Sequence, residues 1–267
     1  VFSNSTEMLV AQKDWARAHD TFFHLHSSEE PNTTRWFYRE YLCSPVEYLH
    51  RAGVLDEDTI LAHQVNNTPV DLEILAATGT NVVHNPLANT ILGSGMPPVI
   101  EMMERGIPLV ISTDGSGSAD CQNILGAARL ASQYQKAFHQ NAHLLHAQEL
   151  LEMITVRPAR MLGLDAGSLE EGMDADAILI DLSRPNLTPS RKDNVIENLI
   201  WASDGSEVRW VIANGKLLKD DYQFVTLDEE EIKEEVFRLS ELMVEYRATR
   251  PEMKTTGIRG KEAEEDG

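Results

Sequence analysis

Short segments that are apolar on both faces recur along the first half of the chain, and each is followed by a stretch with helical periodicity. Four such segments stand out, at residues 21–26, 60–65, 81–84 and 108–113. A strand that is apolar on both faces is buried on both, which is typical of parallel sheets covered by helices. The alternation therefore predicts an α/β fold built from parallel β/α units.

Helical segments are expected between these strands and after the last of them. Their predicted bounds are residues 3–20, 45–52, 70–77, 97–105 and 123–136, followed by two short helices at 147–156 and 157–164. For the first helix, the N-cap is expected at Asn4 or Ser5. Its core-facing stripe is expected to consist of Met8, Ala11, Trp15 and Ala18. Residues 34–41 are rich in aromatic side chains and are expected to form a polar loop.

Each predicted strand ends in or just before a histidine or an aspartate. His26, His63, His84 and Asp114 occupy these ends, and Glu29 lies three residues beyond His26. The carboxyl ends of the strands carry the chemistry in β/α barrels. A single histidine at such a position is more often structural, but four polar strand ends in succession predict a site that activates water.

Composition limits the classes of partner and compartment. The formal net charge of −20 and the pI near 4.8 disfavour binding to nucleic acid or to anionic membranes. No apolar run approaches the roughly 20 residues that cross a bilayer. Cys43 and Cys121 offer no disulfide framework, so a reducing cytoplasm is expected.

The chain changes character after the last β/α unit. Residues 1–166 are expected to form the catalytic β/α part, and 167–227 a small β module with a strand at 175–182 and a hairpin turn at Asn214–Gly215. Residues 228–267 are expected to be a C-terminal helix and a disordered tail. The helix itself is expected at 227–247, with acidic residues in its first turns.

Five blocks, in this order, resemble the amidohydrolase superfamily. They are FHLHSSEE, LAHQV, VVHNPLAN with the following GSGMPPVIEMMERGIPLVISTDGSGS, VRPARMLGL, and GSLEEGMDADAILIDL. More narrowly, the chain is similar to the branch of cytosine, guanine and 5'-methylthioadenosine/S-adenosylhomocysteine deaminases and triazine hydrolases, and most of all to the methylthioadenosine/S-adenosylhomocysteine group. The resemblance implies strands five to eight of a (β/α)8 TIM-type barrel and part of a β-sandwich, with the first four strands absent, so that these residues alone are expected to be inactive.

The resemblance also implies roles for the strand-end residues. His26 would be the metal-ligand histidine of the fifth strand, and Glu29 the acid/base of the HxxE motif. His63 would be the sixth-strand histidine that accepts a proton from water, and Asp114 the eighth-strand aspartate that binds metal and orients water. Hydrolytic deamination requires such groups. A divalent metal lowers the pKa of a bound water to about 7, and a carboxylic acid then transfers protons to the substrate.

Further positions follow from the same resemblance. Ser118 would line the substrate pocket, and His84 would support the metal ligands without touching the metal. His24 and His26 form an HxH pair that also marks the family's first strand, but only two strand ends lie between His26 and Asp114, which favours the fifth. Ala88–Asn89 stands where the family has serine-asparagine, and 119–121 depart from its usual asparagines, which leaves the substrate open.

The predicted function is metal-dependent deamination of an aminopurine nucleoside, with release of ammonia. The substrate is expected to be of the 5'-methylthioadenosine, S-adenosylhomocysteine or 5'-deoxyadenosine type, and the metal to be zinc, with iron as the alternative. Other readings are a triazine or other cyclic C–N or C–Cl hydrolase, a guanine or cytosine deaminase, and a noncatalytic binding module. The expected partners are the small-molecule substrate and, as an option, further copies of the chain.

Overall fold

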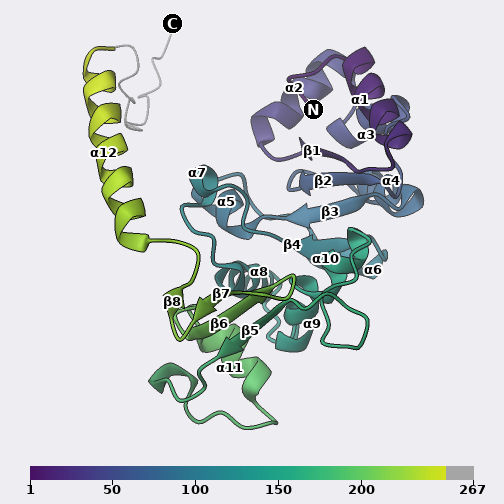
Figure 1. The fold of residues 1–267 in the computed structure, drawn as a ribbon. Coiled ribbons are helices and arrows are strands. Elements are labelled where there is room, and N and C mark those ends of the chain that lie inside the picture. The colour runs from purple at the N-terminus through teal and green to yellow at the C-terminus, as the bar shows by residue number, and fades with distance from the viewer. Residues whose placement is uncertain (251–267) are drawn as a thin grey trace, which may run out of the picture.

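The computed structural model describes residues 1–250 of the 267-residue chain. It contains two sheets, and helices surround the first of them (Figure 1). The elements of the first part are α1 (Thr6–Ala18), β1 (Phe23–Ser27), α2 (Pro31–Tyr41), α3 (Pro45–Arg51), β2 (Thr59–His63), α4 (Pro69–Thr78), β3 (Asn81–His84), α5 (Pro86–Ile91), α6 (Val99–Glu104), β4 (Leu109–Ile111), α7 (Ser116–Ala119), α8 (Ile124–Phe138), α9 (Ala147–Met153) and α10 (Val156–Met161).

The first sheet is parallel, in the order β1-β2-β3-β4. All four predicted strands are present, each within about two residues of its expected bounds. Four of the intervening helices begin with a proline in the first turn, where the missing N–H is harmless. The α/β prediction with parallel strands is confirmed, and because the strands run the same way, their carboxyl ends meet along one edge.

The second sheet is antiparallel and small. It comprises β5 (Ala177–Ile180), β6 (Val208–Ala213), β7 (Lys216–Asp220) and β8 (Gln223–Phe224). Asn214 and Gly215 join β6 to β7 with φ values of 48° and 70°, the conformation that a tight hairpin turn requires. The predicted hairpin is confirmed.

One helix that sequence did not predict interrupts the second sheet. After the short helix η1 (Pro185–Leu187), the chain forms α11 (Val195–Ala202), which packs against α8 and α9. Ile200 is fully buried there, and the Arg129 Nε donates to its carbonyl at 2.8 Å. The segment between β5 and β6 therefore contributes to the core beside the first sheet.

Helix α1 begins as expected but buries a different face. Ser5 caps it by accepting from the Met8 amide, whereas Met8 and Trp15, predicted to face the core, are 51% and 60% exposed. The buried residues are Leu9, Lys13 and Ala16. The predicted stripe is therefore wrong, because the helix buries the face that carries Lys13.

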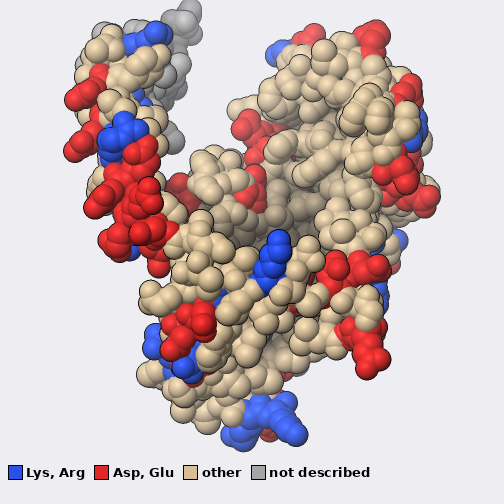
Figure 2. All heavy atoms as spheres, in the orientation of Figure 1, with Lys and Arg blue, Asp and Glu red and all other residues tan. Residues whose placement is uncertain are grey.

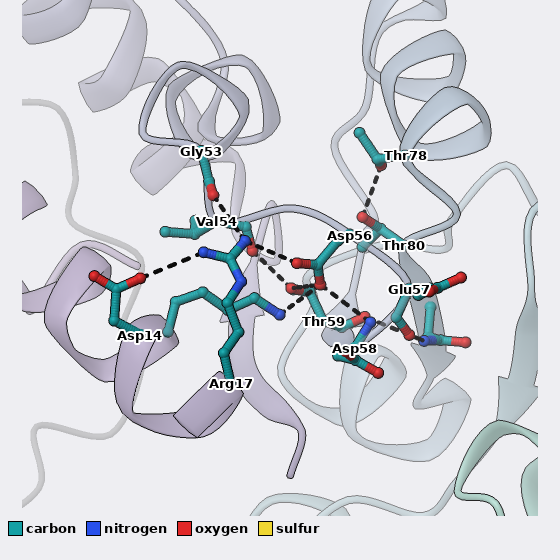
Figure 3. A network of polar contacts seen from close by, with 12 residues as sticks. Asp14, Arg17, Gly53, Val54, Asp56, Glu57, Asp58, Thr59, Thr78 and Thr80 are labelled. Carbon is teal, nitrogen blue, oxygen red and sulfur yellow. Dashed lines mark hydrogen bonds and ion pairs between the residues drawn. The ribbon is translucent and has the colours of Figure 1, made fainter. Parts of the chain in front are cut away.

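Lys13 is buried because a carboxylate meets it. Its Nζ donates to Asp56 Oδ1 at 2.5 Å, and Arg17 Nη2 donates to Asp56 Oδ2 at 2.8 Å (Figure 3). Burial raises the pKa of Asp56, but hydrogen bonds from Lys13 and Arg17 outweigh it, and the pKa is lowered. Asp56 Oδ1 also accepts from Thr59, so this network joins α1 to the residue that opens β2.

The predicted polar loop at residues 34–41 is wrong. These residues belong to α2, which ends at Leu42 in the left-handed conformation. Phe37 is buried, and its ring lies against Tyr41 and Tyr48. The aromatic side chains therefore pack α2 against α3, which explains why a polar-looking segment is helical.

The last described element is α12 (Glu229–Ala248), a helix set apart from the sheets (Figure 1). Asp228 caps it, and Glu229, Glu230 and Glu231 occupy its first turn, as predicted. None of its residues is buried, and acidic side chains gather over its lower part in Figure 2. The predicted disordered tail lies outside the described residues.

Across residues 1–250, no helix has the length and the apolar composition needed to cross a membrane.

Candidate active site

The carboxyl edge of the parallel sheet gathers most of the predicted site residues. His26 lies in β1, His63 ends β2 and Asp114 follows β4. One ligand atom from each of these three lies within 4.8 Å of the others. The rings of His26 and His63 are stacked, with centroids 5.1 Å apart. Residues that are 88 positions apart in sequence, from 26 to 114, thus form one cluster.

A break in the strand pleat lets His63 join this cluster. The register pairs His26 with Ala62 and Ser27 with His63, so regular strands would direct His26 and His63 to opposite faces. His63 instead has a φ of 76°, and the following Gln64 has 50°. Such conformations in residues other than glycine are strained by about 1–3 kcal/mol each and concentrate at functional sites.

Asp114 shares this backbone conformation, with a φ of 67°. Its Oδ1 accepts from the Gly115 amide at 2.6 Å, and its Oδ2 lies 3.6 Å from His63 Nε2. Its carbonyl accepts from Gln122 Nε2 at 3.0 Å, and Gln122 Oε1 accepts from Thr113. One carboxylate oxygen is thus tied to the backbone while the other faces the histidines.

Glu29 brings a second carboxylate to the same place. Its Oε2 lies 3.7 Å from His63 Nε2. Asn66, in the loop after β2, donates to the Glu29 carbonyl at 2.7 Å. The loop after β1 is therefore held by the loop after β2, with the Glu29 side chain directed at the cluster.

His63 is fully buried, and a hydrogen bond at its Nδ1 fixes the ring. Its Nδ1 lies 2.7 Å from Oδ1 of Asn89, which is also fully buried. Its Nε2, which faces the two carboxylates, has no hydrogen-bond partner within the described residues. A buried polar atom without a partner is unusual in a native protein and calls for an explanation such as an ion or water.

The other predicted residues lie near this cluster but are not part of it. His84 is fully buried, and neither ring nitrogen has a partner in the described part of the chain. Burial, and then the charge of His63, lowers the pKa of His84 to about 3, so its ring is neutral. Ser118 is half-buried in α7, where its amide donates to the Gly115 carbonyl.

His24 precedes His26 by two residues and belongs to the same strand face. Burial lowers its pKa, and the charges of His26 and His63 lower it further, while Asp114 raises it. The sequence did not predict the roles of two residues. Asn89 holds the His63 ring, and Gln122 holds the backbone of Asp114. The VVHNPLAN block pointed to Asn89 only as a neighbour of the pocket.

The sequence pattern of the Amidohydrolase family matches residues 1–218. The chain belongs to this family. Among curated relatives, it is 35% identical over 240 residues to 5'-deoxyadenosine deaminase of Methanosarcina mazei. The aligned region covers 90% of the chain and 55% of that relative. The chain is also 34% identical over 217 residues to 5-methylthioadenosine/S-adenosylhomocysteine deaminase of Pyrococcus furiosus, and this alignment covers 81% of the chain and 51% of the relative.

Two solved structures share its fold. An adenosine deaminase from Xanthomonas campestris with bound zinc superposes with a TM-score of 0.84 at 26% identity, over 89% of the chain and 54% of that structure. Atrazine chlorohydrolase from Arthrobacter aurescens, complexed with zinc, gives 0.81 at 28% identity, over 88% and 52%. The chain thus spans about half the length of the relatives it matches.

Proposed function

We propose that this chain carries the catalytic residues of a metal-dependent hydrolase that deaminates adenosine-type nucleosides. The observation that carries the proposal is the convergence of His26, His63 and Asp114 within 4.8 Å, with Glu29 3.7 Å from His63. Two imidazoles and two carboxylates at one strained sheet edge suit a cation and proton transfer. Membership of the amidohydrolase family, and the names of the relatives, support the reaction class.

The donor set fits a divalent metal. His26 and Asp114 would hold it, because imidazole nitrogen and carboxylate oxygen are ordinary zinc ligands. The partnerless Nε2 of buried His63 would not bind the metal and would face the water. We propose zinc, which the Xanthomonas campestris neighbour contains, with iron as the alternative. When bound, such a metal supplies a water that is acidic enough to lose a proton near neutral pH.

The chain's own groups would then move protons. Glu29 is placed to carry a proton first to a ring nitrogen of the purine and then to the departing amino group, which leaves as ammonia. His63 Nε2, between Glu29 and Asp114, can accept a hydrogen bond or a proton from water. Asp114 Oδ2 is free to orient that water because Oδ1 is bound to the Gly115 amide.

Ser118 and His84 have supporting parts in this proposal. Ser118 lies in α7, four residues after Asp114, and would line the substrate pocket. His84 is neutral and fully buried at the end of β3, so it would support the ligands by packing and would carry no charge into the site.

We also propose that the parallel sheet corresponds to strands five to eight of an eight-stranded β/α barrel. Its four-stranded order β1-β2-β3-β4 and the placement of polar residues at the carboxyl ends support this assignment. Residues 1–166 would form this partial barrel, 167–227 part of a β-sandwich, and 228–267 a C-terminal appendage.

The experiment is a substrate panel on a complete, zinc-loaded enzyme that contains this chain, because residues 1–267 alone are expected to be inactive. Loss of adenine absorbance and release of ammonia would be followed with 5'-deoxyadenosine, 5'-methylthioadenosine and S-adenosylhomocysteine, beside guanine, cytosine and a chlorotriazine. We expect turnover of the three adenine nucleosides. Turnover of guanine or cytosine alone would leave a deaminase of the same family and refute the nucleoside assignment.

A triazine hydrolase is the second candidate. The superposition on atrazine chlorohydrolase, with a TM-score of 0.81, favours it. The same metal ligands would serve, because displacement of chloride by water also requires an activated water. Release of chloride from the triazine with no ammonia from the nucleosides would decide for this alternative.

A further inference from the structure

Asn89 reaches the site only through His63. Its Oδ1 lies 2.7 Å from His63 Nδ1, and both side chains are fully buried. The backbone around Asn89 is fixed on both sides, since its amide donates to the Asn85 carbonyl at 3.0 Å and its carbonyl accepts from the Ser94 amide at 2.9 Å. The carboxamide is therefore held against one nitrogen of the ring.

This contact decides where the imidazole carries its proton. An amide oxygen only accepts, so a bond to Oδ1 requires a proton on Nδ1 and leaves a lone pair on Nε2 in the neutral ring. In the reverse arrangement, the amide nitrogen would donate to Nδ1 and the proton would be on Nε2. That proton would meet no acceptor in bonding range, because the Asp114 and Glu29 oxygens are 3.6 and 3.7 Å away.

We propose that Asn89 is a positioning residue that keeps the proton of His63 on Nδ1, so that Nε2 presents a lone pair to the cluster. The proposal rests on the proposed function in one respect, because an Nε2–H could not accept a proton from water. Groups that orient a histidine of a metal site through its second nitrogen typically change metal affinity or activity by about 10- to 100-fold when they are removed. Asn89 meets that description with an amide in place of the more usual carboxylate or carbonyl.

The first test reads the tautomer directly. Long-range proton–nitrogen correlation spectra of the metal-free 267-residue chain, labelled at histidine and recorded above the pH at which imidazoles titrate, show which ring nitrogen carries the proton. The His63 signals are assigned by their loss in His63→Gln. We expect a protonated Nδ1 and a bare Nε2 in the parent chain.

Three variants test whether the side-chain oxygen of Asn89 is what fixes the His63 proton. Asn89→Leu has a similar shape but cannot accept, and should lose the fixed Nδ1–H form. Asn89→Asp keeps an acceptor in the same place and should retain it. Asn85→Leu is the matched control, because Asn85 is a buried neighbour whose Oδ1 has no partner in residues 1–250, and its loss should leave the His63 spectrum unchanged.

Zinc titration gives a second readout. Asn89→Leu should bind Zn²⁺ about 10- to 100-fold more weakly than the parent chain, and Asn89→Asp should restore the affinity. A parent spectrum with the proton on Nε2, or an Asn89→Leu spectrum identical to the parent, would overturn the proposal. Neither readout depends on nucleoside turnover, so the proposed deaminase activity could fail in its own assay while this assignment holds, or the reverse.

Discussion

Replacement of Asp56 by asparagine should destabilise the protein far more than replacement of its partner Lys13 by methionine. Lys13 has no exposed side-chain surface, whereas Asp56 is 30% exposed and retains Arg17 at 2.8 Å. Asp56→Asn leaves a buried ammonium without a countercharge, which typically costs about 3–5 kcal/mol. Lys13→Met fills the same space with an apolar chain and leaves a carboxylate that is still paired, so the loss should be about 1 kcal/mol or less.

Urea unfolding followed by circular dichroism measures both changes. The double variant Lys13→Met with Asp56→Asn should recover about 2 kcal/mol or more relative to Asp56→Asn, because the buried charge is gone. Asp14→Asn is the control, since Asp14 meets the same arginine at the surface and should change stability by less than about 1 kcal/mol. An Asp56→Asn variant as stable as the parent, or a double variant that loses the sum of both single losses, would contradict the argument.

The pH dependence of the same network has a definite sign. The pKa of Asp56 is lower in the folded chain than in the unfolded one, where aspartate titrates near about 3.9. Its contribution to the free energy of unfolding is therefore fully present above that value and is lost as the pH falls through the folded pKa. On acidification, Asp56→Asn should unfold at a higher pH than the parent chain. The difference in free energy of unfolding between the variant and the parent should shrink below about pH 3.9.

Three further outcomes are expected. In a complete enzyme that contains this chain, Glu29→Gln should retain zinc by elemental analysis but lower nucleoside deamination by about 10²- to 10⁴-fold, while Glu30→Gln, its exposed neighbour, should leave turnover unchanged; equal rates in both variants would remove Glu29 from proton transfer. His26→Ala should reduce the zinc bound per chain in the same analysis, and a full equivalent in that variant would exclude His26 as a ligand. Deletion of residues 228–267 should leave the urea midpoint unchanged, because no residue of α12 is buried, and a clear drop would show that this helix supports the rest of the chain.

Sequence periodicity was sufficient for the parallel sheet and for the three residues of the cluster. The strands are apolar on both faces, so their burial could be recognised without knowing their partners. The polar residue at each carboxyl end then stood out against that background. His26, His63 and Asp114 follow from this pattern, and the register of β1, β2, β3 and β4 brings them together.

What sequence did not predict depends on contacts between distant segments. Lys13 looks like a surface residue until Asp56, 43 positions away, is placed beside it. Residues 34–41 look like a loop because their aromatic side chains pack against α3 and not against a sheet. Asn89 acquires its part only when α5 is folded over the end of β2, since the hydrogen bond to His63 spans 26 residues.

The left-handed backbone at His63 sets stability and chemistry against each other at one position. Glycine adopts that conformation without strain, so a library of variants recovered for resistance to protease alone should drift toward glycine at position 63. The same library recovered for turnover should return histidine. Two such selections can be run in parallel on one pool of genes. The residues that they recover should differ most at positions where the chain bends out of its strands. A map of those positions would outline the active site without any knowledge of the substrate.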